Sequence, residues 1–309
     1  MRAAHVLAPA KVNLHLEVYA RREDGFHGLL SVFQMVSLCD EITVRSLTTL
    51  DVCEIGGDFD FPPEENIIWK CCRLFREATG LRTGLGVEVT KRIPQGAGLG
   101  GGSSDGAAFL RALNVLFGAG FSPGELAALG SAAGSDVPFF CREAAALVTG
   151  RGEFVEALVP RTDFFLVLAL PPLQVSTAWA FRALDEARER AGFLLEGGGC
   201  EGGGRFFSPP AGQKEYIKAL YERESPENWG FFNSFYPVLK ESQPVFAALR
   251  RRLLEAGALN AGLSGSGSAM FGVFQDEARA RAAAEALRGD YPRTSFLSPL
   301  AGMPAVVLQ

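Results

Sequence analysis

Alternating hydrophobic and polar residues mark the first element of the chain. The alternation runs from Val12 to Val18 and breaks at Asp24-Gly25, as in a strand that ends in a turn. Further strands are predicted where short apolar runs lie between helical patterns or turn signals. These runs cover residues 41–47, 86–93, 164–170 and 268–274, with a last strand at either 294–300 or 304–308.

Large apolar residues at spacings of three and four predict the helices. In residues 65–80 they precede Gly80, which is typical of a glycine cap, and in residues 122–134 Ser122 and Pro123 form a helix start. Residues 135–141 are an interrupted apolar segment. The remaining helices are predicted at 105–117, 176–192, 242–257 and 276–289.

The mixture of helices and strands predicts an α+β protein of two units that meet near residues 155–165. We assign the first unit to residues 1–157 and the second to residues 158–309. Within the second, residues 192–212 combine a cluster of glycines with two prolines, so no packed element is expected there. This stretch is predicted to be a flexible loop.

Composition narrows the functional classes. With 309 residues, 48% of them hydrophobic, the chain can bury a sizeable core. A net charge of -5 argues against broad binding to nucleic acid or to anionic membranes, and no obligatory protein partner is indicated. No stretch reaches 18 uncharged apolar residues, and the six cysteines show no CxxC spacing. We therefore expect a soluble cytoplasmic protein with reduced, mostly buried thiols.

A glycine-rich run, IPQGAGLGGGSSDGAAF at residues 93–109, connects a predicted strand to a predicted helix. Glycines let the backbone approach a ligand, and the unpaired N–H groups of a helix start favour an anion such as phosphate. Tight packing alone is the alternative explanation. A P-loop is disfavoured because no Lys-Ser or Lys-Thr follows the glycines, and a dinucleotide fold because the run lies about 90 residues into the chain.

The run resembles the PxGxGLGSSSA loop of the superfamily of galactokinase, homoserine kinase, mevalonate kinase and phosphomevalonate kinase. Two more motifs of that superfamily are matched in order, PAKVNL at residues 9–14 and AGLSGSGSAMFGVF at residues 261–274. The resemblance implies a two-domain small-molecule kinase with an N-terminal ATP-binding domain and a ferredoxin-like, substrate-binding C-terminal domain. Its active site would lie in the cleft between the domains.

Within the superfamily the chain resembles the family of 4-diphosphocytidyl-2-C-methyl-D-erythritol kinases. The most discriminating block is DGFH at residues 24–27 with the following VFQ at 32–34, supported by ENII at 65–68 and GSDVPFF at 134–140. This family implies ATP-dependent phosphorylation of the substrate's 2-hydroxyl in the non-mevalonate isoprenoid pathway, by direct transfer without a phosphoenzyme. Another small-alcohol kinase of the superfamily and a catalytically silent nucleotide sensor are the alternatives.

By this resemblance Asp136 matches the general base and Lys11 the cation beside it. Taken alone, such residues most often serve turns and solvated edges. The chemistry suits them, because a carboxylate can accept the hydroxyl proton while an ammonium stabilises the developing charge. A buried Lys11 would also hold Asp136 ionised.

The remaining site residues are also implied by the resemblance. Phe26 and Phe181 would stack on the cytosine and His27 would bond its edge, with Thr177 as a neighbouring polar contact. Asn13 would lie near the substrate's diphosphate, and Phe33 would be a further substrate-binding residue. ATP, with Mg²⁺ carried by the nucleotide and no metal ligand assigned, would contact Asn66, Pro94, Gly96, Gly98, Leu99, Gly100, Gly101, Gly102, Ser103 and Ser104.

Some positions depart from the family pattern. Phe26 replaces a tyrosine, which keeps the ring and loses the hydroxyl, and Gly28 replaces a common glutamate. Asp105 stands where many members have asparagine, which places a carboxylate beside the expected phosphate loop. Residues 197–204 have no counterpart in the family and are interpreted as an insertion.

Overall fold

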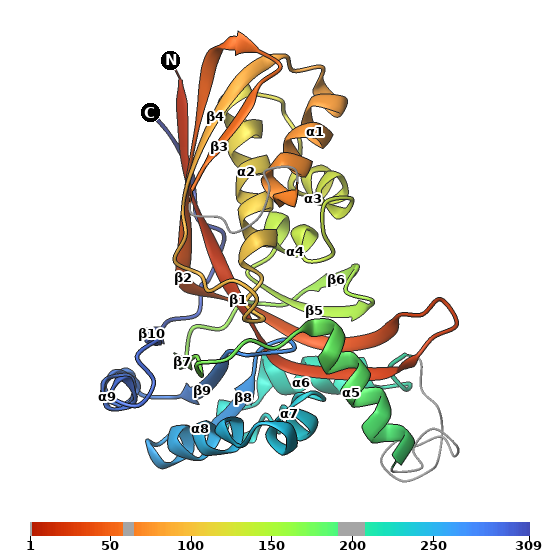
Figure 1. Cartoon of the computed structure of the whole chain (residues 1–309), viewed down its shortest axis with the longest axis vertical. Coiled ribbons are helices and arrows are strands. Elements are labelled where there is room, and N and C mark those ends of the chain that lie inside the picture. Colours follow the sequence, from red (N-terminus) through yellow and green to blue (C-terminus); the bar gives the residue numbers. More distant parts are fainter. Residues whose placement is uncertain (1, 58–64, 191–207) are drawn as a thin grey trace.

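The computed structural model describes residues 2–57, 65–190 and 208–309. Most of the predicted glycine-rich loop at 192–212, including the insertion at 197–204, therefore lies outside the described residues. Two sheets organise the described part: the first runs from the top of Figure 1 into its lower half, and the second lies in the lower half. The α+β fold predicted from the sequence is confirmed.

The first sheet is built on two long antiparallel strands, β1 (Ala3–Arg21) and β2 (His27–Leu50). Its order is β11-β1-β2-β4-β3, and β5 and β6 branch from β2. The other members are β3 (Cys53–Gly56), β4 (Thr83–Thr90), β5 (Ala145–Gly150), β6 (Phe154–Ala157) and β11 (Val306–Leu308). Both long strands extend well beyond the predicted ranges. Pairing between the strands keeps residues extended even where hydrophobic and polar residues do not alternate strictly.

Four helices cover one face of this sheet (Figure 1): α1 (Ile67–Thr79), α2 (Gly101–Phe117), α3 (Pro123–Ser131) and α4 (Val137–Arg142). The predicted caps are confirmed, since Gly80 ends α1 with φ 71° and Ser122 starts α3 with a capping box. Helix α2 begins four residues before the predicted start at 105. Helix α4 forms where the sequence indicated an interrupted apolar segment, because a proline in the first turn of a helix sacrifices no bond.

The second sheet has the order β10-β7-β9-β8, and every neighbouring pair is antiparallel. With helices between β7 and β8 and between β9 and β10, this is the ferredoxin-like order that the resemblance implied. Its strands are β7 (Phe165–Ala169), β8 (Asn260–Leu263), β9 (Met270–Phe274) and β10 (Thr294–Leu297). The helices are α5 (Thr177–Arg190), α6 (Gln213–Arg223), the short 3₁₀ helix η2 (Pro226–Asn228), α7 (Tyr236–Ser242), α8 (Pro244–Glu255) and α9 (Glu277–Arg288).

The two halves of the chain share a hydrophobic core. One buried cluster combines Val12 and Leu30 of the long strands with Leu166 and Phe271 of the second sheet. Both candidates for the last strand are formed, β10 in the second sheet and β11 against β1. The boundary at 157/158 stays a prediction, and the final strand lies in the first sheet.

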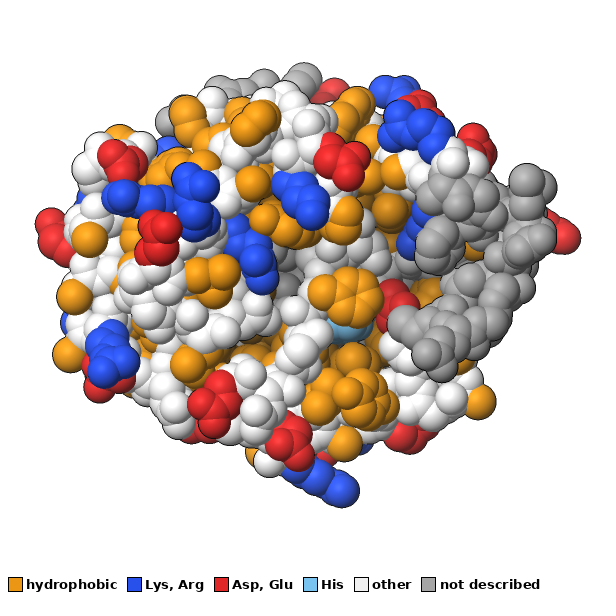
Figure 2. All heavy atoms as spheres, turned by 90° about the horizontal axis from the view of Figure 1, so that it is seen from below, with side chains coloured by type: hydrophobic (Ala, Val, Ile, Leu, Met, Phe, Trp, Pro, Cys, Tyr) orange, Lys and Arg blue, Asp and Glu red, His pale blue; other side chains and the backbone are white. Residues whose placement is uncertain are grey.

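The charge pattern of the surface and the state of the thiols can be compared with the expectations drawn from composition. Figure 2 shows a face on which basic, acidic and hydrophobic side chains are interspersed. In the described part of the chain no helix is long and apolar enough to cross a membrane. The five cysteines described there are free, and Cys71, Cys72 and Cys141 are buried. The expectation of free, mostly buried thiols holds for these five.

Candidate active site

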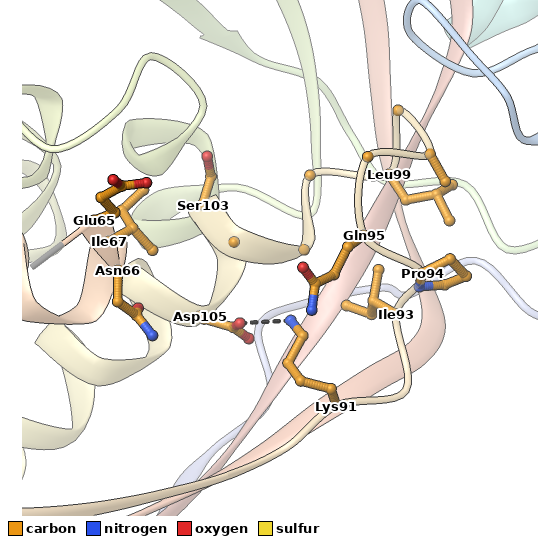
Figure 3. Close-up of a pocket in the computed structure, with 16 residues that line it drawn as sticks. Glu65, Asn66, Ile67, Lys91, Ile93, Pro94, Gln95, Leu99, Ser103 and Asp105 are labelled. Carbon is orange, nitrogen blue, oxygen red and sulfur yellow. Dashed lines mark hydrogen bonds and ion pairs between the residues drawn. The ribbon is translucent and has the colours of Figure 1, made fainter. Parts of the chain in front are cut away.

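The glycine run forms one wall of a cavity of about 390 Å³ between β4 and α2 (Figure 3). Nine of the ten residues expected to contact ATP line this cavity: Asn66, Pro94, Gly96, Gly98, Leu99, Gly100, Gly101, Gly102 and Ser103. The tenth, Ser104, follows Ser103 in the chain and does not line the cavity; its buried hydroxyl has no hydrogen-bond partner among the described residues. Asn66 also starts α1, since its side-chain oxygen accepts a bond from the Ile68 N–H at 2.9 Å.

The glycines of the loop are required by close approach. Gly98 has φ 79°, and a Cβ placed on it would lie 2.1 Å from the carbonyl oxygen of Ser264. At Gly100, with φ 71°, a Cβ would lie 2.9 Å from the Phe140 ring. Gly100 also precedes α2 and offers no side-chain cap, so the first N–H groups of that helix are not satisfied by a capping side chain. Unpaired N–H groups and the helix dipole make this end of the cavity attractive to an anion.

A buried ionic cluster lies at the side of this cavity. The Lys91 ammonium donates to Asp105 Oδ2 at 2.6 Å and also to Asp40 (Figure 3 shows the first pair). Asp40 accepts two more bonds, from the backbone N–H groups of Arg92 and Ile93. Sequence reasoning left Asp40 and Lys91 without a role, although Lys91 opens the loop motif at KRIPQG.

Asp105 is the protonated member of this buried cluster. Burial raises the pKa of the Asp105 carboxyl to about 8, although Lys91 opposes the rise. Burial alone would lower the pKa of Lys91, but Asp105 and Asp40 raise it above its usual value. At neutral pH we therefore assign a neutral Asp105 beside the Lys91 cation. A protonated Asp105 offers one donor and one acceptor, as an asparagine would, so its departure from the family pattern brings no extra anion to the loop.

Lys11 and Asp136 meet next to the glycine loop. The Lys11 ammonium lies 3.9 Å from Asp136 Oδ2, donates to Asn13 Oδ1 at 2.6 Å and sits 4.4 Å from the centre of the Phe33 ring. Burial lowers the pKa of Lys11, and Asp136 partly offsets this effect. Irregularities in the pairing of β1 with β2 fall at Pro9/Lys11 and Asn13/His15, where bulges re-aim side chains.

Hydrogen bonds join the three sequence motifs in one place. The Ser264 hydroxyl, from the C-terminal motif, donates to the Gly98 carbonyl at 2.9 Å and accepts from the Asn13 N–H at 3.2 Å. The Lys11 N–H donates to the Leu99 carbonyl at 2.9 Å. Residues some 250 positions apart in the chain therefore fix the loop beside Lys11.

A second cavity, of about 910 Å³, lies between the turn that joins β1 to β2 and helix α5. Phe26, His27 and Phe181 line it, as expected for three residues of one substrate pocket. The His27 ring lies 4.9 Å from the Phe181 ring, and its Nε2 pairs with Asp185 Oδ1 at 2.9 Å. Phe26 is 55% exposed. Asp185, which orients His27, was missed because a single aspartate on a helix carries no signal in the sequence.

The other expected substrate residues lie elsewhere. Phe33 and Asn13 are buried beside Lys11, and neither lines the second cavity. Thr177, the first residue of α5, bonds through its hydroxyl to Ser266 at 2.9 Å and is likewise absent from that lining. Of the expected substrate residues, Asn13 and Phe33 thus lie beside Lys11, and Phe26, His27 and Phe181 line the second cavity. Thr177 lies in neither group.

Known proteins match most of the chain. The N-terminal domain of the GHMP kinases matches residues 66–143, and their C-terminal domain matches residues 216–293. The 4-diphosphocytidyl-2-C-methyl-D-erythritol kinase of Treponema pallidum is 38% identical over 283 residues, which are 92% of this chain and 94% of the relative. That of Geobacter metallireducens is 37% identical over 290 residues, 93% of this chain and 95% of the relative. The chain belongs to the 4-diphosphocytidyl-2-C-methyl-D-erythritol kinase family.

Solved structures agree with membership of this kinase family. A crystal structure of 4-(cytidine 5'-diphospho)-2C-methyl-D-erythritol kinase superposes with a TM-score of 0.78 at 34% identity, covering 96% of this chain and all of the other. Homoserine kinase from Cytophaga hutchinsonii superposes with a TM-score of 0.66 at 19% identity, covering 99% of this chain and 94% of the other, and shows a shared fold alone. The resemblance drawn from the motifs is thereby confirmed at the level of the family.

Proposed function

We propose that this chain phosphorylates the 2-hydroxyl of 4-diphosphocytidyl-2-C-methyl-D-erythritol with ATP, giving the 2-phosphate and ADP, in the cytoplasm as a step of the non-mevalonate pathway. The observation that carries the proposal is the position of the Lys11–Asp136 pair. Lys11 is bonded to the glycine loop through Leu99. Asp136 lies beside Gly152, which belongs to the turn from β5 to β6. Arg151 of the same turn lines the second cavity.

The transfer needs a base and a cation at the reacting hydroxyl. The hydroxyl oxygen bonds to the γ-phosphorus, the bond from that phosphorus to the bridging oxygen of ADP breaks, and Asp136 takes the hydroxyl proton. The Asp136 side chain is 26% exposed and so can meet a substrate, whereas the Lys11 side chain is 5% exposed. An ammonium held out of water stabilises developing negative charge more strongly than one in solvent.

The glycine loop and the first turn of α2 would hold the ATP phosphates. Phosphate oxygens would accept bonds from the N–H groups that lack a capping side chain. The buried Ser104 hydroxyl of the same turn has no partner among the described residues. Among the described residues no three His, Cys, Asp or Glu side chains gather in a way that could hold a metal. Mg²⁺ would arrive with the nucleotide, bound mainly to its phosphate oxygens, and would neutralise phosphate charge there.

The cytidine end of the substrate would enter the second cavity. Phe26 and Phe181 offer ring faces for the base, and ring stacking tolerates the loss of the tyrosine hydroxyl at Phe26. Asp185 binds Nε2 of His27 and so fixes the imidazole. This leaves Nδ1 as the nitrogen that could bond the base edge.

Release of ADP with three acceptors tests the substrate assignment. With ATP and magnesium present, the cytidyl substrate should support turnover, while homoserine and mevalonate should not exceed the rate without acceptor. Turnover with homoserine or mevalonate instead would assign the chain to another small-alcohol kinase. Binding of ATP without turnover on any of the three would favour the silent nucleotide sensor.

Replacement of the proposed base tests the mechanism. Asp136 makes no side-chain capping bond at the start of α4, so Asp136→Asn removes the charge without removing a cap. We expect kcat to fall about 100- to 10,000-fold while ATP binding, measured by calorimetry, is retained. Asp290→Asn, at an exposed residue paired with Arg252, is the matched control. An Asp136→Asn variant within a few fold of the parent in kcat would refute the role of the base.

A further inference from the structure

Arg151 has no role in the catalysis described above, yet it lies between the two ends of the proposed substrate site. It occupies the turn between β5 and β6, where Gly150 and Gly152 both have positive φ, 73° and 114°. A Cβ on Gly152 would lie 4.0 Å from Asp136 Oδ1. The turn therefore places the backbone next to Arg151 against the proposed base.

The side chain of Arg151 points to the other end. Its guanidinium lies over the Phe26 ring, 4.9 Å from the centre, and Arg151 lines the second cavity together with Phe26, His27 and Phe181. Residue 151 thus spans the interval between the group that would accept the hydroxyl proton and the rings that would hold the base. In the proposed substrate this interval is filled by the diphosphate, which links the cytidine to the methylerythritol.

Arg151 is free to take a new partner at little cost. Its ion pair is with Glu153, where Nε lies 3.7 Å from Oε1, and the two side chains are 48% and 39% exposed. Pairs of this kind contribute little, because both groups are well solvated. A guanidinium presents its donors in a planar fork that matches two phosphate oxygens.

Other arginines that line the cavity are less suited. Arg21 donates through Nε to the Gly25 carbonyl at 3.1 Å, within its own turn. Arg22 is held more closely than Arg151, since its ion pair with Asp24 measures 3.2 Å against 3.7 Å for the pair of Arg151 with Glu153. Arg182 extends from α5, the wall that also carries three acidic residues of the lining, Asp185, Glu186 and Glu189. An anion placed near Arg182 would therefore meet carboxylates as well.

We infer that Arg151 is a specificity residue that binds the diphosphate of the cytidyl substrate and leaves the Phe26 ring when that substrate enters. The inference rests on the proposed function, because it takes the base pocket and the reacting hydroxyl as the two ends of one ligand. It adds a way to select the diphosphate: cytidine alone meets only the rings, whereas a cytidine carrying two phosphates also meets the guanidinium.

The test compares cytidine, cytidine monophosphate and cytidine diphosphate as ligands of the full chain, by calorimetry. In Arg151→Met we expect the Kd of the diphosphate to rise about 10- to 100-fold, as for loss of a hydrogen-bonded charge pair, while the Kd of cytidine stays within about threefold. Arg151→Lys keeps the charge without the fork and should fall between. Arg251→Met, at an exposed arginine of α8 that does not line the cavity, is the matched control and should change the diphosphate Kd by no more than about threefold.

The outcomes distinguish a failure of the proposed Arg151 role from a failure of the proposed function. The role of Arg151 would be overturned, and the proposed function left standing, by any of three results. The parent chain could bind cytidine and its diphosphate equally, Arg151→Met could weaken both equally, or Arg251→Met could cause as large a loss. A parent that binds none of the three ligands would overturn the proposed function itself. If Arg151→Met melts at a lower temperature than the parent, the Arg151→Lys variant decides whether Arg151 binds the diphosphate. Its preference for cytidine diphosphate over cytidine must still be lower than that of the parent.

Discussion

Replacing Asp105 by asparagine should remove a pH dependence of stability. The Asp105 carboxyl is 3% exposed, and burial raises its pKa to about 8 in the folded protein. In the unfolded chain the same group titrates near its ordinary value of about 3.9. Between these two values the folded protein keeps a proton that the unfolded chain releases.

The sign and the size of the pH effect on stability follow from this difference between the folded and unfolded pKa values of Asp105. The stability that the protonated carboxyl contributes is complete below about pH 4 and is lost progressively as the pH rises toward 8. Inside that window the loss is about 1.4 kcal/mol per pH unit, hence about 2.7 kcal/mol from pH 5 to pH 7. Asparagine does not titrate. The free energy of unfolding of Asp105→Asn, relative to the parent, should therefore rise by about that amount across the two units.

Chemical denaturation at pH 5, 6 and 7, followed by tryptophan fluorescence, measures the difference. Asp51→Asn is the control, since Asp51 is exposed and its hydrogen bond with Arg82 lowers the pKa of its carboxyl, so it is ionised in both states across the window. Its difference from the parent should stay constant with pH. Parallel curves for Asp105→Asn and the parent would refute the reasoning, because they would mean that Lys91 holds Asp105 ionised throughout.

Three further substitutions test separate parts of the site. Phe26→Ala should raise the KM for the cytidyl substrate about 10-fold or more and leave that for ATP nearly unchanged, and equal effects would contradict the base pocket. Lys11→Met should lower kcat about 100-fold or more, measured by ADP release, and an unchanged kcat would exclude charge stabilisation by this residue. Gly98→Ala should destabilise by more than about 1 kcal/mol in denaturation, because its Cβ would strike the Ser264 carbonyl at positive φ, whereas Gly102→Ala, with no atom nearer than 4.0 Å, should not.

Short-range physics explains what the sequence predicted about the fold. Gly80 and Ser122 mark helix ends by the conformations and bonds that they allow locally, and the alternation from Val12 to Val18 indicates a strand wherever that strand lies. Elements such as α6, α7 and β8 were not predicted. They are short and carry little periodic signal, so packing against the rest of the chain decides them.

The sequence by itself determined the family and the residues of the three motifs, because each motif is a contiguous run. Only the tertiary structure decided how they combine: that Ser264 holds Gly98, that Asp40 and Lys91 meet Asp105, and that Arg151 lies over Phe26. The physical reason is the distance along the chain between the residues that interact. Burial and ionic pairing depend on groups that lie far apart in the chain and become neighbours only when the sheets and helices pack, so one chain pattern is compatible with many pairings until the fold selects one.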